Sequence, residues 1–217
     1  MSGLVEVGHY RREFAVGIER LFENALDWEH LPHLHGHSFS AIELVAADRN
    51  GWRATVTLDD GQTMVLDLTV TPSGWVTRTE ADGDLVSEIR TVAEATGPER
   101  CSVSVMFHVA GTSAERNAAT GVYYERLYAK LYDDDERMMV ARAEAKRRPA
   151  AEWRRTRDVT LADGRSCAIP LYCPHQGLPL DAEPDAAGII TCPWHGYRFD
   201  AATGAGVSDQ ACGWRRR

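Results

Sequence analysis

The sequence lacks any run of apolar residues long enough to cross a bilayer. No stretch of its 217 residues approaches the roughly 20 consecutive apolar residues that a membrane helix needs. The first residues, MSGLVEVGHYRREF, also lack the apolar segment of a signal peptide. Low-complexity segments are absent as well. These absences predict a cytoplasmic protein with no membrane partner.

Cysteine is scarce, with five in the chain. In the cytoplasm thiols are kept reduced, so cysteines there bind metal or stay free more often than they form disulfides. Two of the five, Cys173 and Cys192, lie in a pair of similar segments near the C-terminus. The other three, Cys101, Cys167 and Cys212, are expected to be dispensable for any site that those segments form.

Positive charge is scarce in the first two thirds of the chain only. Residues 1–140 hold 12 Lys and Arg against 23 Asp and Glu, a net charge of −11, whereas residues 141–217 hold 12 against 9, a net charge of +3. Such a shift predicts two domains, which we place at 1–148 and 149–217. The basic cluster at 146–157 and the RRR terminus are interpreted as a solvated linker and tail. No nucleic-acid partner is expected, because no nucleic-acid-binding motif accompanies the charge.

The first domain is rich in alternating, β-branched sequence. Residues 4–14 alternate moderately, which predicts a strand, and residues 15–28 have apolar side chains at helical spacing. Pro32 and Gly36 then break the pattern. A meander of strands joined by short turns is predicted at 40–47, 52–58, 63–70, 74–80, 85–94 and 101–109.

A long helix is predicted at 113–147, ended by Pro149. Its apolar stripe is Tyr124, Leu127, Tyr128, Leu131, Met138 and Met139. This order of strand, helix, antiparallel meander and long helix resembles the α+β helix-grip fold, also called START-like. The resemblance implies a curved sheet around the last helix, with a pocket between them. The second domain reads as small and all-β, with a hairpin at 159–172.

Two segments of the second domain echo one another: LYCPHQGLPL at 171–180 and TCPWHGYRFD at 191–200. They offer four metal donors, Cys173, His175, Cys192 and His195. As a Cys₂His₂ set these donors could bind a tetrahedral Zn²⁺ ion in a structural zinc site. Each segment carries one cysteine and one histidine, however, and this suits a two-iron cluster with the cysteines on one iron and the histidines on the other.

The paired segments resemble the Rieske motif C-x-H-x(15–17)-C-x-x-H, including the glycine after the second histidine. The resemblance implies a 2Fe-2S cluster bound by the four donors. Because two neutral imidazoles replace two thiolates, such clusters have potentials of roughly −150 to +300 mV, and they accept and pass on one electron. The Rieske domain implied here is shorter than usual.

A second cluster of histidines lies in ENALDWEHLPHLHGHSF, residues 23–39. Its Asp27-x-x-His30-x(4)-His35 pattern resembles the D-x(2)-H-x(4)-H motif of the Rieske non-haem iron oxygenases. The resemblance implies a mononuclear Fe(II) on His30 and His35. Pro32 is predicted to interrupt the helix between them, so that both rings can converge. The two other histidines of the segment have no matching role.

Non-haem iron of this kind needs one carboxylate as well. In YDDDERMMV, Asp135 lies four residues after Leu131 and three before Met138, near the middle of the apolar stripe. Asp133 points nearly opposite and Asp134 lies at the edge. A buried carboxylate requires a partner, and a metal would serve. The resembled family also takes its third ligand from an acidic pair on the last helix. Asp135 is therefore the predicted ligand, with Asp134 as the alternative.

The resemblance covers nearly the whole chain, with the two domains in reversed order. It implies an oxygenase that hydroxylates or demethylates a small apolar or aromatic substrate with O₂. It also implies a ferredoxin or flavin reductase as electron donor, and a homo-oligomer such as a trimer. Asp27 is implied to link His30 to His175 or His195, within one chain or between two. The competing interpretation is a START-like ligand-binding domain fused to a Rieske ferredoxin-type module without a second iron.

Overall fold

A computed structural model of the chain describes residues 3–207 and residue 213. The expectations for Cys212 and for the RRR terminus lie outside these residues. By its internal contacts the chain forms two compact units, Met1–Met139 and Val140–Arg217. The division falls inside one long helix, α3 (Ala114–Arg147); the predicted domain boundary after residue 148 stays a prediction. Within the described residues, no helix is both long and apolar enough to span a membrane.

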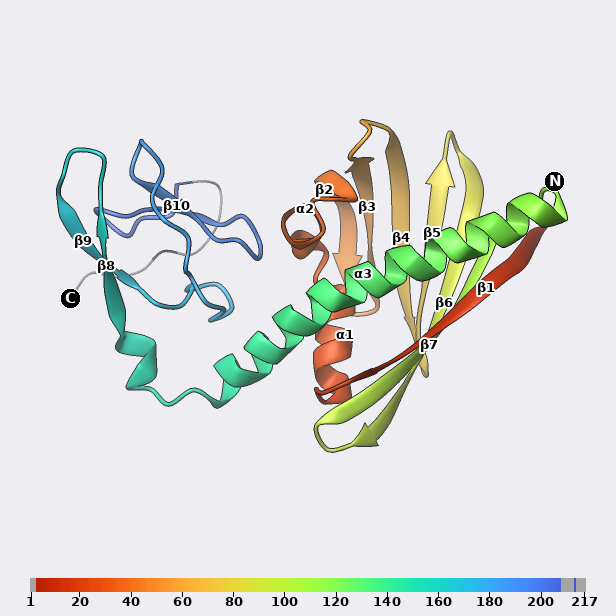
Figure 1. Ribbon diagram of the computed structural model, residues 1–217, viewed down its shortest axis with the longest axis horizontal. Coiled ribbons are helices and arrows are strands. Elements are labelled where there is room, and N and C mark those ends of the chain that lie inside the picture. The colour runs from red at the N-terminus through yellow and green to blue at the C-terminus, as the bar shows by residue number, and fades with distance from the viewer. Residues whose placement is uncertain (1–2, 208–212, 214–217) are drawn as a thin grey trace. The chain divides into compact units, whose positions relative to one another are not determined.

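The first unit is built on one antiparallel sheet of seven strands, in the order β1-β7-β6-β5-β4-β3-β2 (Figure 1). The strands are β1 (Leu4–Phe14), β2 (Phe39–Asp48), β3 (Gly51–Leu58), β4 (Thr63–Thr71), β5 (Gly74–Ala81), β6 (Asp84–Gly97) and β7 (Arg100–Ala110). Three short helices join β1 to β2: α1 (Ile18–Leu26), η1 (Trp28–His30) and α2 (Leu31–Leu34). Strands β2 to β7 pair in sequence order through short turns, and β1 closes on β7.

One face of the sheet packs against α3 and the other is polar. On β3, Trp52 and Ala54 are buried on the helix side, whereas Arg53 between them pairs with Asp67 of β4 on the opposite face. On β7, the ring of Phe107 lies against tyrosines of α3. The predicted α+β helix-grip fold is thus confirmed, because a single apolar sheet face holds the last helix.

Close contact between α3 and β1 depends on a glycine. A Cβ atom at Gly121 would lie 2.0 Å from the carbonyl oxygen of Val7, so no larger residue fits there without movement. Farther along α3, Tyr132 stacks with Tyr10 and meets Phe14 edge to face. The helix is therefore fixed along β1, which determines which of its side chains face the interior.

The second unit contains η2 (Glu152–Arg154) and two small sheets, β8 (Thr156–Thr160) with β9 (Ser166–Pro170), and β10 (Ile189–Thr191) with β11 (Arg198–Asp200). Its core gathers Val159, Ile169, Ile190 and Phe199 from all four strands. The first of the paired cysteine segments follows β9, and the second joins β10 to β11. The predicted hairpin corresponds to β8 and β9.

The basic cluster at 146–157 is more than the solvated linker that was predicted. Arg148 packs over the ring of Tyr172, and Arg157 donates hydrogen bonds to Glu183 and to the carbonyl of Ala182. The prediction was wrong for these two half-buried residues because charge composition does not indicate which groups a basic side chain will contact.

Candidate metal centres

The histidine segment passes through parts of three short helices within a few residues. Helix α1 ends just before Asp27, whose backbone leaves the helical region (φ −88°, ψ 80°). His30 ends η1, and His35 follows the last residue of α2. Pro32 lies in the first turn of α2, where its missing N–H is not needed. Pro32 therefore does not interrupt a helix as predicted: α1 ends at Leu26, η1 follows, and Pro32 lies in the first turn of α2, which begins at Leu31.

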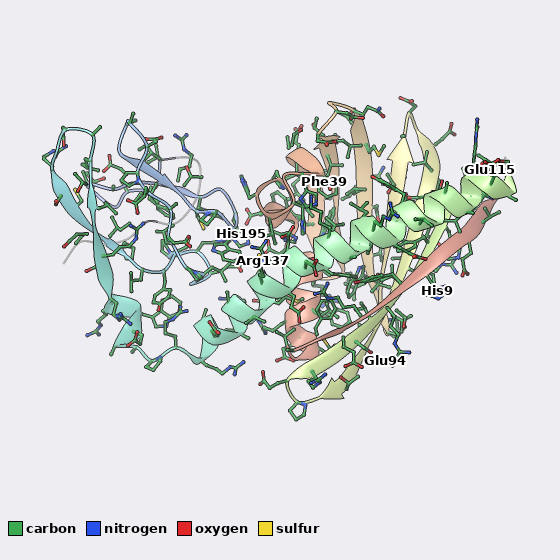
Figure 2. The ribbon with its side chains drawn as sticks, viewed as in Figure 1. His9, Phe39, Glu94, Glu115, Arg137 and His195 are labelled. Carbon is green, nitrogen blue, oxygen red and sulfur yellow. The ribbon has the colours of Figure 1, made fainter. Side chains whose placement is uncertain are left out.

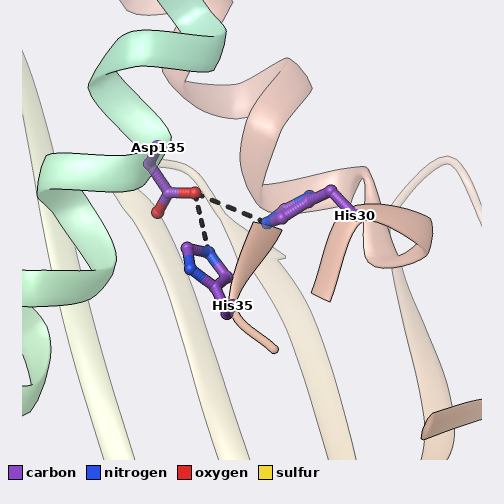
Figure 3. Close-up of side chains that lie close together, drawn as sticks. All are labelled: His30, His35 and Asp135. Atoms are coloured by element: carbon purple, nitrogen blue, oxygen red, sulfur yellow. Dashed lines mark hydrogen bonds and ion pairs between the residues drawn. The ribbon is translucent and has the colours of Figure 1, made fainter. Parts of the chain in front are cut away.

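Three of the predicted ligands come together in the first unit (Figure 3). His35 Nε2 lies 3.0 Å from Asp135 Oδ1, and His30 Nε2 lies 3.4 Å from the same oxygen. The two rings are 5.1 Å apart at an angle of 74°. Within the described part of the chain, this is the one set of three or more His, Cys, Asp or Glu whose donor atoms all lie within 4.8 Å of one another.

Asp135 is both buried and ionised. Its relative exposure is 6%, whereas the side chain of Asp133 is 68% exposed and pairs with Arg12. Burial alone would raise the pKa of Asp135, but hydrogen bonds from His30 and His35 outweigh this effect and lower the pKa to about 2. A buried carboxylate between two imidazoles is a donor set that suits a divalent transition metal.

Asp134 lies on the other side of the His35 ring, near its Nδ1 atom. Its Oδ2 atom is 3.8 Å from Nδ1 of His35 and 3.9 Å from Nδ1 of His37, and it also pairs with Arg137. The Nδ1 atoms of His30 and His35 are buried and have no hydrogen-bond partner among the residues that the structure describes. The Nε2 atoms of His30 and His35 thus both face Asp135. Asp134 does not reach the place where these two atoms converge.

An apolar cavity of about 130 Å³ adjoins the three donors. Its walls include Leu21 and Leu68 together with the indoles of Trp52 and Trp75. Trp52 is held by a 2.9 Å hydrogen bond from Nε1 to the carbonyl of Ala25. The alternating pattern of the strands indicated that the strand residues of this wall share one face of the sheet. It did not indicate which face meets α3.

A second cavity of about 340 Å³ lies nearer the N-terminal end of α3 and borders the first. Side chains that line both cavities are Phe39, at the start of β2 (Figure 2), Leu66, Thr77, Tyr128 and Leu131. Tyr128 is half-buried, and desolvation of its ring raises the pKa of its phenol, which stays uncharged at neutral pH. The two cavities together suit a mostly apolar molecule longer than the first cavity alone could hold.

Asp27 lines the first cavity at the junction of α1 and η1. The structure does not bring it into hydrogen-bond contact with Nδ1 of His30, and its predicted role as a link between metals stays a prediction. Of the histidines without a predicted role, His33 is exposed and His37 is half-buried, with its ring centroid 6.1 Å from that of His35.

The paired segments of the second unit have the same backbone geometry. In the first, the N–H of Cys173 donates to the carbonyl of Leu178, and the N–H of Gly177 donates to that of Cys173, both at 2.8 Å. The second segment repeats both bonds from Cys192 and Gly196, at 2.8 and 2.9 Å. Both glycines have positive φ, 77° and 67°, which explains why glycine follows each histidine-bearing turn.

The four donors of these segments lie close together. Hydrogen bonds from the side chains of Cys173 and His195 lower the pKa of Cys192, against the opposing effect of burial. The rings of His175 and His195 are 4.8 Å apart and perpendicular. The two cysteines are thus neighbours and the two imidazoles are neighbours, as a cluster with two thiolates on one iron and two imidazoles on the other requires.

Aromatic side chains support the donors. The ring of Tyr197 stacks on that of His175, with centroids 4.2 Å apart and planes 19° from parallel. The indole of Trp194 donates a 2.9 Å hydrogen bond to the carbonyl of Pro179 in the other segment. These contacts hold the two segments at a fixed spacing.

A family model, described as the Rieske [2Fe-2S] domain, matches residues 130–213. Residues 130–213 are thus similar to the Rieske [2Fe-2S] domain. The match supports a 2Fe-2S cluster in the second unit, and it begins within α3, before the cysteine segments.

Several solved structures are similar to about two thirds of this chain. Norcoclaurine synthase from Thalictrum flavum, as a point mutant with a transition-state analogue, is 17% identical over 64% of this chain and 98% of its own, with a TM-score of 0.49. A START superfamily protein from Mycobacterium smegmatis is 18% identical over 62% of this chain and 98% of its own (TM-score 0.46). The ZhuI aromatase/cyclase from Streptomyces sp. R1128 is 12% identical over 68% and 98% (TM-score 0.47). Among curated proteins, none matches significantly.

Proposed function

We propose that this chain is a Rieske-type non-haem iron oxygenase. The cluster in the second unit would be the electron source for an Fe(II) ion held by His30, His35 and Asp135 in the first. The bound Fe(II) would supply O₂ activation for the hydroxylation or demethylation of a small apolar or aromatic molecule.

The observation that carries the proposal is the convergence of two imidazole nitrogens on one buried, ionised carboxylate. His35 Nε2 and His30 Nε2 lie 3.0 and 3.4 Å from Asp135 Oδ1. Two histidines and one carboxylate on one side of an Fe(II) ion leave its other positions open for small molecules. A closed Cys₂His₂ or Cys₄ site would not do so.

The surrounding residues have clear roles in this proposal. Asp135 supplies negative charge at neutral pH because its pKa is about 2. Trp52, Leu68 and Trp75 line the cavity beside the donors with apolar surface, which would limit the water around them. An environment poor in water strengthens the attraction between the carboxylate and a cation. The neighbouring cavity would hold most of the substrate.

Further partners follow from the proposed activity. A ferredoxin or flavin reductase would reduce the cluster, and the chain would work as a homo-oligomer, such as a trimer. Asp27 would link His30 to His175 or His195 for electron transfer, within one chain or between two. The position of Asp27 in the cavity wall beside His30 supports a role near this ligand.

The second candidate is a ligand-binding domain fused to an electron-transfer module without a second iron. One observation favours it: Nε2 of His35 and Oδ1 of Asp135 form a 3.0 Å hydrogen bond that needs no metal. The 340 Å³ cavity could also hold a ligand that is not transformed.

Nitric oxide, which binds open positions on Fe(II), separates the two candidates. Anaerobic protein loaded with Fe(II) and treated with nitric oxide should give a half-integer-spin EPR signal. His35→Ala should lose this signal and keep the cluster's own EPR signal. His33→Ala, a histidine of the same segment with an exposed side chain, should keep both. Absence of the signal from the parent protein would support the second candidate.

A further inference from the structure

Two arginines bind the backbone of the first cysteine segment. Arg142, near the end of α3, donates a 2.5 Å hydrogen bond from Nη1 to the carbonyl of Gln176. Arg148, just after α3, donates a 2.7 Å hydrogen bond from Nη1 to the carbonyl of Gly177. These carbonyls belong to the two residues that directly follow His175, so both contacts fall inside the turn that presents Cys173 and His175.

Arg148 is held in place by aromatic rings. Its guanidinium carbon lies 3.4 Å from the ring centroid of Tyr172 and 5.1 Å from that of Trp153. Tyr172 directly precedes Cys173. A Cβ atom at Gly177 would lie 2.0 Å from the ring of Trp153. The tryptophan therefore packs directly on the turn, and the charge of Arg148 has a fixed position.

The charge of these arginines has a direct electrostatic consequence. When one electron from an external reductant such as dithionite enters the site of Cys173 and His175, the site gains one negative charge and the reductant is oxidised by one electron. A nearby fixed cation stabilises the more negative, reduced form. Guanidinium groups remain protonated at all working pH values, so this stabilisation does not depend on pH.

We propose that Arg142 and Arg148 are positioning residues for the cluster turn and that their positive charges raise the reduction potential of the cluster. The inference rests on the proposed Rieske cluster. It goes beyond the ligands themselves, because it assigns the tuning of the potential to residues at the C-terminal end of α3 and directly after it. Tyr172 and Trp153 support the tuning by fixing Arg148.

The test is a spectroelectrochemical titration of the full chain. Arg148→Gln and Arg142→Gln keep hydrogen-bond donors but lose charge. At the parent midpoint, each is expected to lower the ratio of reduced to oxidised cluster about tenfold, a shift of about 59 mV for a one-electron couple. Arg148→Lys keeps the charge and should restore most of the potential. It should also lose cluster faster in the presence of a chelator, because an ammonium lacks the planar stack on Tyr172.

Arg165→Gln is the matched control. It removes the same charge from a different part of the second unit, where Arg165 pairs with Asp163 and is well exposed; its midpoint should stay at the parent value. If both Gln variants have the same midpoint reduction potential as the parent protein, the proposal is overturned. So would Gln variants that fold by circular dichroism yet never hold a cluster, since the arginines would then serve assembly alone. A parent protein with zinc in place of the cluster would be a different result, a failure of the proposed function.

Discussion

Replacement of Asp135 by Asn tests the proposed iron site through the stability of the protein. The pKa of Asp135 is about 2, against an ordinary value of 3.8. This difference corresponds to about 2 kcal/mol of folding free energy at neutral pH, because one pKa unit is about 1.4 kcal/mol. Asp135→Asn removes the charge at nearly constant volume. The metal-free variant is therefore expected to unfold about 4–8 °C below the parent at pH 7.

The pH dependence of this loss has a definite sign. Because folding lowers the pKa, the ionised carboxylate contributes its full stability above the unfolded value of 3.8. The contribution is lost as pH falls through about 2. The difference in unfolding free energy between parent and Asp135→Asn should thus be constant from pH 7 to about pH 5 and should shrink below about pH 4. Chemical unfolding followed by fluorescence measures it.

Addition of Fe(II) under anaerobic conditions should widen the difference. Metal at one hundred times its dissociation constant stabilises the parent by about 2.7 kcal/mol, and Asp135→Asn should gain much less. Asp133→Asn, which alters an exposed carboxylate on the same helix, should gain as much as the parent. Equal stabilisation of parent and Asp135→Asn by Fe(II) would refute the assignment, and equal metal-free stability at pH 7 would refute the hydrogen-bonded carboxylate itself.

Three further experiments address the remaining parts of the proposal. Cys173→Ser should abolish the visible absorption and acid-labile sulfide of the cluster, whereas Cys167→Ser should keep both; a Cys173→Ser protein that keeps both would place the cluster elsewhere. Asp27→Ala should retain both metals but slow cluster oxidation at least tenfold in single-turnover experiments. If the cluster of Asp27→Ala is oxidised as fast as that of the parent protein, Asp27 is not on the electron path. Activity recovered by mixing Asp27→Ala chains with His175→Ala chains would show transfer between chains. Leu66→Trp fills the space between the cavities and should weaken binding of a fluorescent aromatic probe without altering metal content; unchanged binding would place the ligand outside them.

The sheet could be predicted nearly strand by strand. Alternating β-branched residues and short turns mark each strand, and the strand predicted at 63–70 corresponds to β4 (Thr63–Thr71). The long helix predicted at 113–147 corresponds to α3, because Pro149 and the apolar stripe mark its extent. Both features are local, so a sequence pattern reports them directly.

The iron site could be predicted only in part. Helix geometry placed Asp135 on the interior side of α3, beside Leu131 and Met138. Its meeting with His35, one hundred residues earlier, was expected only from the family resemblance, because no local pattern reports so distant a contact. The roles of Trp52 and Arg148 had no signal at all, since alternation and charge do not reveal what a side chain will touch.

Iron and sulfide analysis of anaerobically purified parent and Asp135→Ala protein, combined with EPR, tests the central claim most directly. The account predicts about three iron atoms and about two sulfides per parent chain, and about two of each in the variant, with an unchanged cluster signal. About two iron atoms per chain in both proteins would contradict the second iron site. A colourless protein with stoichiometric zinc would contradict the cluster as well.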